Sequence, residues 1–142
     1  MEKLHIVETD ETPMVLLDAA NLQFEFSGKS LPEDVTSFYG PILDWIDDYA
    51  DEMDGEEAVF KFNLIYFNTA SSKMILDIFM AIEGMVEDGK NVSVEWIYDE
   101  DDEDMEEAGN RLGEFLLKRI NGEKINKLQM IDKFKYFNQE KK

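Results

Sequence analysis

The stretch AVFKFNLIYFNTASSK, from Ala58 to Lys73, decides the fold that the rest of the chain builds around. It begins with apolar residues at alternate positions and becomes wholly apolar over residues 64–67, which predicts a central strand with helices above and below it. Polar residues start abruptly at Asn68, and an amphipathic helical pattern follows at once. The stretch therefore predicts a buried strand that delivers a hydroxyl-rich turn to the N-terminus of a helix.

Hydrophobic patterns on either side of this stretch predict the other elements. Apolar spacing predicts strands over residues 4–7, 14–18, 22–26 and 92–98, and helices over residues 35–53, 74–86 and 105–119. Asn21 suits the turn of an N-terminal hairpin, and a strand, a helix and a strand in this order form a right-handed crossover. The predicted fold is α/β: a mixed central sheet with parallel βαβ units, helices packed on the sheet, and a single domain over residues 1–142.

Three local features are less regular. Ser30 and Glu33 have the spacing of a capping box, which predicts Ser30 as the N-cap of the first helix. Gly40-Pro41 interrupts the pattern of that helix and predicts a kink or two consecutive helices. The final stretch, residues 125–137, fits a strand as well as it fits a helix.

Charge is the unusual part of the composition. The chain has 142 residues, with 14 Lys and Arg against 33 Asp and Glu, and a formal net charge of −19. A field of that sign repels nucleic acids and anionic membranes, so neither is an expected partner. Cysteine is absent, and no apolar run approaches the roughly 20 residues that span a bilayer. We expect a soluble, cytoplasmic protein.

The residues after the central strand are the first candidate site. Ligands and modifications collect at the carboxyl ends of strands in open α/β sheets, and a helix N-terminus favours an anion. A phosphate on Thr69 would suit that position, with Lys73 one helical turn away. The simpler alternative is that Thr69 only caps the helix and Lys73 points into water, and the residue types alone favour this alternative.

An acidic run from Asp99 to Glu107 is the second candidate, with eight carboxylates in nine residues. It follows the next parallel strand, so it is expected at the same sheet edge as Thr69. One hypothesis is a Mg²⁺ or Ca²⁺ site, although the run lacks the glycine and spacing of an EF-hand loop. The simpler interpretation places the later acids in the first turn of a helix, and a docking surface for a basic partner is the better functional alternative.

Catalytic motifs are lacking. His5 is the only histidine, with no nucleophile at a recognisable spacing, and a solvent-facing role is expected for it. No Walker, Rossmann or zinc motif occurs, so no cofactor is expected. Trp45 and Trp96 are interpreted as core residues. These observations favour a protein that is not an enzyme, with a metal-binding module or metal-dependent enzyme built on the acidic run as the alternative.

Several short motifs, taken together and in order, resemble one family. They are Thr12-Pro13, Gly28-Lys-Ser-Leu-Pro-Glu33, Phe38-Tyr39, Asp44-Trp45, Tyr66-Phe-Asn-Thr-Ala-Ser-Ser-Lys73, Trp96-Ile-Tyr98 and Asp101-Asp-Glu-Asp-Met105. The chain resembles the SiaC-type bacterial regulatory phosphoproteins, whose fold is similar to STAS domains and anti-sigma-factor antagonists. The likeness spans residues 4–113, and residues 114–142 are expected to be a helix end and a C-terminal extension.

The resemblance implies a partner switch. In that family a threonine is phosphorylated by a kinase related to anti-sigma-factor kinases and dephosphorylated by a metal-dependent serine/threonine phosphatase. The unphosphorylated form activates a diguanylate cyclase, which links the family to cyclic-di-GMP signalling and biofilm formation. By position the phosphoacceptor is Thr69, supported by Asn68, Ser71, Ser72 and Lys73. Ala70 stands where the family usually has a second serine, which removes one competing acceptor.

Overall fold

The computed structural model describes residues 1–120 and 122–134. The elements in chain order are β1 (Leu4–Ile6), β2 (Met14–Asp18), β3 (Gln23–Ser30), α1 (Val35–Glu52), β4 (Ala58–Phe67), α2 (Thr69–Glu87), β5 (Val92–Tyr98), α3 (Glu103–Gly113), the 3-10 turn η1 (Glu114–Leu116), β6 (Leu117–Ile120), β7 (Glu123–Asn126) and β8 (Leu128–Asp132). In these residues no helix is long and apolar enough to cross a membrane.

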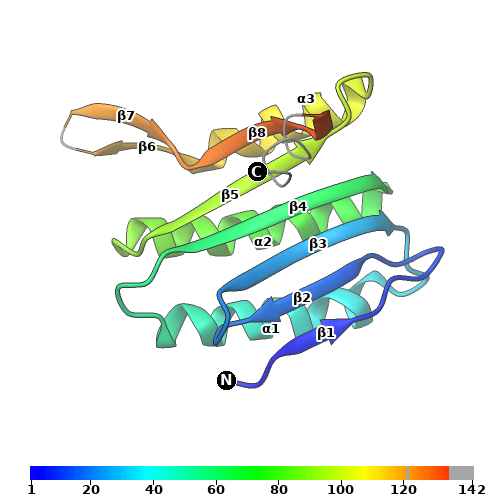
Figure 1. Cartoon of the computed structure of the whole chain (residues 1–142), viewed down its shortest axis with the longest axis horizontal. Coiled ribbons are helices and arrows are strands. Elements are labelled where there is room, and N and C mark those ends of the chain that lie inside the picture. The colour runs from blue at the N-terminus through cyan, green and yellow to red at the C-terminus, as the bar shows by residue number, and fades with distance from the viewer. Residues whose placement is uncertain (121, 135–142) are drawn as a thin grey trace.

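Six of the strands form one mixed sheet in the order β1-β2-β3-β4-β5-β8 (Figure 1). The first three pair antiparallel, and β3, β4, β5 and β8 run parallel to one another. The β2–β3 hairpin closes at Asn21, whose side chain and backbone both donate hydrogen bonds to Asp18. The predicted α/β class, the hairpin start and the parallel βαβ units are confirmed.

Helices α1, α2 and α3 lie on one face of the sheet, so within the described residues the prediction of helices above and below β4 is wrong (Figure 1). Each crossover, from β3 to β4, from β4 to β5 and from β5 to β8, steps in the same direction along the sheet. Right-handed crossovers that step in one direction put every connecting helix on the same side. The apolar end of β4 is accordingly open to solvent, with Ile65 53% and Tyr66 52% exposed.

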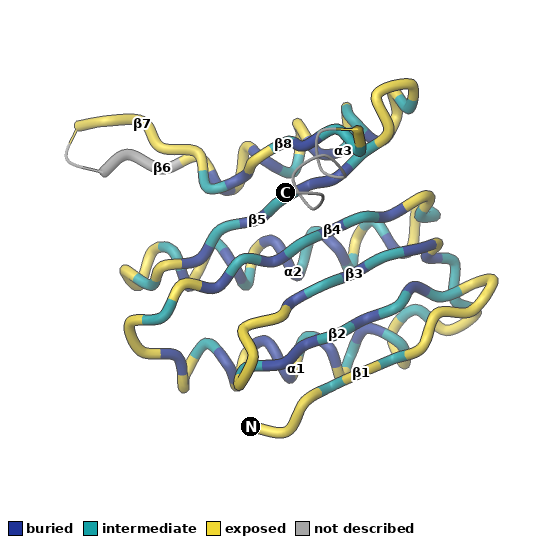
Figure 2. Tube along the Cα trace, in the orientation of Figure 1, coloured by how far each residue is buried: buried dark blue, intermediate teal, exposed yellow. Residues whose placement is uncertain are grey.

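Buried residues follow one another along the central strands and along α1 and α2 (Figure 2), and many of them are aromatic. Phe24 stacks on Phe60 at 4.8 Å between ring centroids, and Phe26 stacks on Phe62 at 4.6 Å. Both pairs are direct neighbours in the β3–β4 register. Trp96 continues the row on β5, 5.7 Å from Phe62. Such in-register pairs on one sheet face stabilise the strand register, and the interpretation of the tryptophans as core residues is confirmed.

Helix α1 begins at a different N-cap from the predicted one, and it is one helix rather than two at Gly40-Pro41, where a kink stays a prediction. Its N-cap is Asp34, which accepts a hydrogen bond from the Ser37 backbone N–H, whereas Ser30 is the buried last residue of β3. Ser30 extends the strand because it pairs with Phe67 of β4. The helix also continues through Pro41 as one element, because a proline removes a single N–H donor from a helix whose apolar face is otherwise well packed.

The C-terminal part completes the sheet. Helix α3 ends at Gly113 rather than at Arg119, because the 3-10 turn η1 follows it and residues 117–120 pair with β7 as strand β6. Strands β6 and β7 form a separate hairpin. Strand β8 then pairs parallel with β5, so the strand interpretation of residues 128–132 is confirmed. In the rest of the ambiguous stretch, residues 125–126 belong to β7 and residues 133–134 are helical, whereas residues 135–137 lie outside the described residues.

Candidate functional site

Helix α2 begins directly at the end of β4, at the carboxyl edge of the parallel strands. Asn68 is its N-cap: the side-chain oxygen accepts the Ser71 backbone N–H at 2.9 Å. The backbone N–H of Asn68 donates to the Ser30 carbonyl at 3.1 Å, which fixes the helix start to the end of β3. The predicted strand and helix are therefore confirmed, but the hydroxyl-rich segment is the first turn of the helix itself rather than a separate turn.

Thr69 is the first residue of α2, and its side chain is exposed. Its hydroxyl makes no hydrogen bond to any residue in the described part of the chain. The alternative in which Thr69 caps the helix is wrong, because Asn68 already occupies the N-cap position. The backbone N–H groups of a first helical turn have no partner within the helix, and the helix dipole is positive there. An exposed hydroxyl thus stands beside groups that favour an anion.

Ser71 is fully buried and points into the protein. The Ser30 hydroxyl donates to Ser71 Oγ at 2.9 Å, and the Tyr39 hydroxyl lies 2.5 Å from Ser30 Oγ. The single hydrogen of the Ser30 hydroxyl is donated to Ser71, so the Tyr39 hydroxyl is the donor to Ser30. Burial raises the pKa of Tyr39, so this hydroxyl stays protonated. We call Tyr39, Ser30 and Ser71 the hydroxyl network, and it joins α1, β3 and α2.

The other predicted support residues lie on the outside of the same turn. The Ser72 hydroxyl donates to the Thr69 carbonyl at 2.7 Å, and Lys73 is exposed. The sequence motifs point to these residues by position, but nothing local reveals that Ser71 faces inward. The parts of Ser30 and Tyr39 in the network are also missed, because their partners are 41 and nine residues away in the chain.

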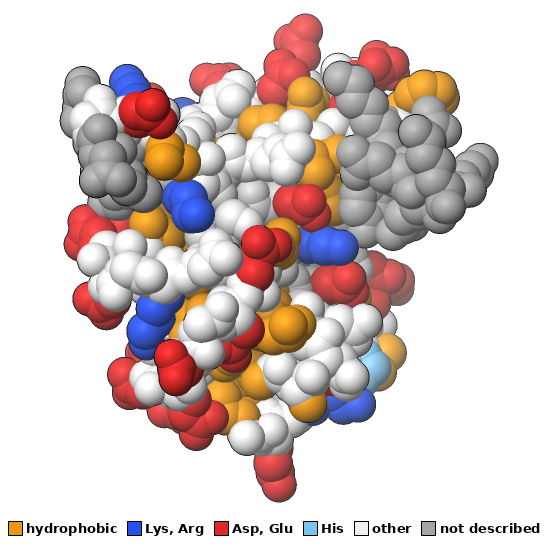
Figure 3. Space-filling view, turned by 60° about the vertical axis from the view of Figure 1, so that its left-hand side comes forward, with side chains coloured by type: hydrophobic (Ala, Val, Ile, Leu, Met, Phe, Trp, Pro, Cys, Tyr) orange, Lys and Arg blue, Asp and Glu red, His pale blue; other side chains and the backbone are white. Residues whose placement is uncertain are grey.

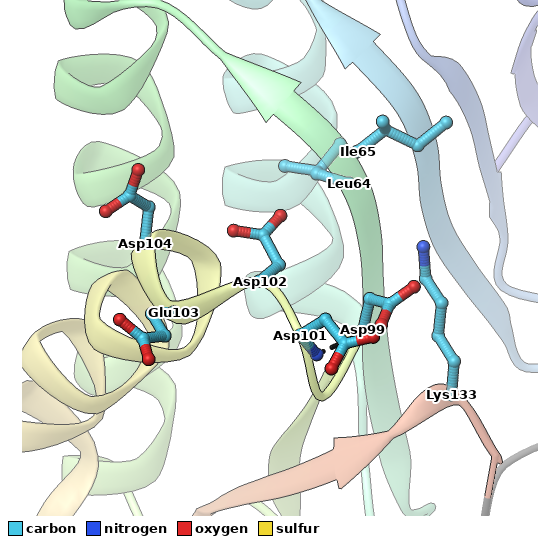
Figure 4. A pocket seen from close by; sticks show the side chains of 8 residues that line it. All are labelled: Leu64, Ile65, Asp99, Asp101, Asp102, Glu103, Asp104 and Lys133. Carbon is cyan, nitrogen blue, oxygen red and sulfur yellow. Dashed lines mark hydrogen bonds between the residues drawn. The ribbon is translucent and has the colours of Figure 1, made fainter.

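The acidic run lies at the neighbouring strand end, where it surrounds a hollow of about 520 Å³ (Figure 4). Asp102 caps α3 by accepting the Met105 backbone N–H at 3.0 Å, and three further acids occupy the first turn of that helix. Lys133 and the β4 residues Leu64 and Ile65 line the other side. The simpler interpretation, acids that stabilise a helix start, is confirmed. Among the described residues no group of His, Cys, Asp or Glu side chains is arranged to hold a metal ion.

Segments that are far apart in the sequence meet at this edge. The Leu31 backbone N–H donates to the Glu11 carbonyl at 2.8 Å, which joins the loop before β2 to the end of β3. Asn68 joins the end of β3 to the start of α2, and the acidic run follows the adjacent β5. His5 lies apart from them, exposed on edge strand β1. Carboxylates are spread over much of the surface in Figure 3, with few basic side chains among them.

The family model for SiaC family regulatory phosphoproteins matches residues 6–125. This chain belongs to the SiaC family. An uncharacterised protein of Pseudomonas aeruginosa strain UCBPP-PA14 is 30% identical over 115 residues, which is 80% of this chain and 90% of that protein. The family model extends beyond Gly113, so nearly all of the β6–β7 hairpin lies within the region that it describes.

Solved structures of SiaC share the fold of this family member. Apo-SiaC from P. aeruginosa superposes with a TM-score of 0.77 at 24% identity, covering 93% of this chain and 98% of that one. SiaC in its complex with the diguanylate cyclase SiaD, whose activator it is, superposes with a TM-score of 0.76 at 26% identity, covering 91% and 98%. The mixed sheet and the helices α1, α2 and α3 packed on it, as residues 1–120 and 122–134 show them, are therefore the SiaC fold.

Proposed function

We propose that this SiaC-family chain is a non-enzymatic signalling switch controlled by reversible phosphorylation of Thr69. The observation that carries the proposal is the position of Thr69: an exposed hydroxyl, free of hydrogen bonds within the described residues, on the first residue of α2. Because Asn68 supplies the cap, a modification of Thr69 leaves the helix start intact. The residue is accessible to an enzyme and dispensable to the fold.

The local chemistry suits a phosphate. Phosphorylation adds about −1.5 to −2 charges at pH 7, and the first-turn N–H groups of α2 favour an anion. Lys73 lies one helical turn from Thr69 and supplies a positive charge, and Asn68 and Ser72 hold the turn in shape. Ser71 supports the same turn from inside through the hydroxyl network.

We further propose three protein partners. They are a kinase of the anti-sigma-factor-kinase type, a metal-dependent serine/threonine phosphatase, and an effector of the diguanylate cyclase class. The effector class is supported by the SiaC of P. aeruginosa, which is the activator of the diguanylate cyclase SiaD. A kinase that uses ATP works in the cytoplasm, so that location belongs to the proposal. We further propose that residues 1–142 are one regulatory domain, because β8 belongs to the same sheet as the N-terminal strands.

Phosphate mapping tests the assignment. The wild-type chain is incubated with the kinase of this type from the same genome and ATP, and the modified residue is identified by mass spectrometry. Thr36 is the matched control, since it is an exposed threonine in the first turn of α1. We expect Thr69→Ala to abolish phosphate incorporation and Thr36→Ala to leave it unchanged. Phosphate at another residue, or incorporation into Thr69→Ala, would sink the assignment.

A further inference from the structure

A groove runs between α2 and the α3–η1 segment, beginning at the first turns of α2. It encloses about 280 Å³. The residues that line it are Phe67, Ser72, Leu76, Ala108, Arg111, Leu112 and Phe115. Phe115 is 39% exposed, and Met80, one helical turn beyond Leu76 on α2, is 53% exposed. The other apolar lining residues are half-buried, so the two helices leave an apolar surface between them that the described residues cover only in part.

The charge lining this groove differs from that of the other hollows. Among the described residues, Arg111 is the one charged residue that lines it, and no carboxylate does. Four other hollows on the described surface are each lined by at least two carboxylates. In a chain with a net charge of −19, an apolar groove with a single cation is a local exception. Its charge is complementary to a partner that carries a carboxylate, whereas the rest of the surface repels one.

The groove is continuous with the Thr69 turn. Ser72 lines the groove, and its hydroxyl donates to the Thr69 carbonyl at 2.7 Å. A phosphate on Thr69 would therefore stand at the mouth of the groove, in the same turn as one of its walls. It would repel a carboxylate brought in by a partner and would compete with it for nearby positive charge.

We propose that this groove is the docking site of the effector, and that it takes an amphipathic helix whose apolar side chains enter the groove and whose carboxylate pairs with Arg111. The inference rests on the proposed function and gives its partner a surface and a chemistry. Apolar grooves between two helices commonly bind a third helix by burying its apolar face. Arg111 fixes the orientation of that helix, and phosphorylation of Thr69 weakens its binding without a change of fold.

Binding of the unphosphorylated chain to the purified diguanylate cyclase from the same genome tests the groove. Phe115→Ala and Arg111→Glu remove the apolar wall and reverse the charge. Ile65→Ala is the control for an exposed apolar residue at the acid-lined hollow, and Lys3→Glu is the control for charge reversal. We expect each groove substitution to raise Kd by about tenfold or more, as for residues at the centre of an interface, and each control to change it by less than about twofold.

Several results would overturn the groove assignment. They are binding that survives both groove substitutions, a loss of binding in Ile65→Ala, no binding by the wild-type chain, or a dimer of this chain that Phe115→Ala dissociates. Circular dichroism of each variant separates lost contact from lost folding. The measurement uses unphosphorylated protein, so a Thr69 that accepts no phosphate contradicts the proposed function while the groove result stands.

Discussion

Ser71 and Ser72 are adjacent serines in the first turns of α2 whose hydroxyls have opposite surroundings. The Ser71 hydroxyl is fully buried and accepts from Ser30, whereas the Ser72 hydroxyl lies near the surface and donates to the Thr69 carbonyl. Replacing either by alanine changes the intrinsic helix propensity by the same amount. The difference between the two substitutions therefore isolates the energy of the buried hydroxyl network.

The magnitude follows from the hydrogen bond that each substitution removes. Ser71→Ala leaves the buried Ser30 hydroxyl without its acceptor, which costs about 1–3 kcal/mol of the free energy of unfolding. For a domain of this size that corresponds to a fall in Tm of roughly 3–9 °C. Ser72→Ala leaves a group that water can satisfy, so its effect stays within about 0.5 kcal/mol.

Urea unfolding followed by circular dichroism measures both variants, and an unchanged m-value confirms that the two free energies are comparable. Tyr39→Phe extends the test to the far end of the network. Tyr39→Phe should lower the free energy of unfolding by less than Ser71→Ala does. The double variant should lose less than the sum of the two single losses, because both residues share Ser30 as a partner. Equal losses in Ser71→Ala and Ser72→Ala would refute the account of a buried network beneath Thr69.

Three further predictions concern other parts of the fold. A Cβ on Gly109 would lie 2.4 Å from Trp96 Cδ1, so Gly109→Ala should lower the free energy of unfolding by about 1–3 kcal/mol and shift Trp96 fluorescence. Gly84 has open space around it, so Gly84→Ala should raise the free energy of unfolding by about 0.5–1 kcal/mol. Asn68→Ala should cost about 1 kcal/mol in urea unfolding and Asn68→Ser much less, because serine also caps helices. Burial, together with the nearby Glu56 carboxylate, raises the pKa of Tyr49. Stability should therefore fall as the pH rises above about 10, because the unfolded chain releases a proton there that the folded chain keeps. In a pH series of thermal melts, Tyr49→Phe should lessen this fall in Tm.

Local patterns predict some elements at their observed bounds and miss contacts that depend on the whole sheet. Strands β4 and β5 are predicted residue for residue, since an alternating or continuous run of apolar residues is a local signal. The N-cap of α1 is misplaced because Ser30 and Asp34 are both good capping residues. The choice between them depends on the pairing of Ser30 with Phe67, which no local pattern contains. The placement of α1, α2 and α3 on the same sheet face likewise depends on a strand order that spacing does not give.

The sequence likewise predicts some features of the candidate site and misses others. Sequence motifs single out Thr69 and its neighbours, and the structure brings this segment to the sheet edge that the strand–helix pattern predicts. They do not separate Ser71, which is fully buried, from Ser72, which lines the groove. That distinction arises from the position of Ser30 in the folded sheet. The groove between α2 and α3 is missed for the same reason, because it exists only once the two helices pack side by side.

The most direct test of the account is the affinity of the effector for the two phosphorylation states of one protein. Wild-type chain is prepared unphosphorylated and fully phosphorylated on Thr69, and each form is titrated with the diguanylate cyclase from the same genome by isothermal calorimetry. Coupling between a regulatory modification and binding is typically about 5- to 150-fold. We predict that phosphorylation weakens binding by a factor in this range, and that Thr69→Ala binds like the unphosphorylated form. Equal affinity of the two forms would contradict the claim that Thr69 is the switch.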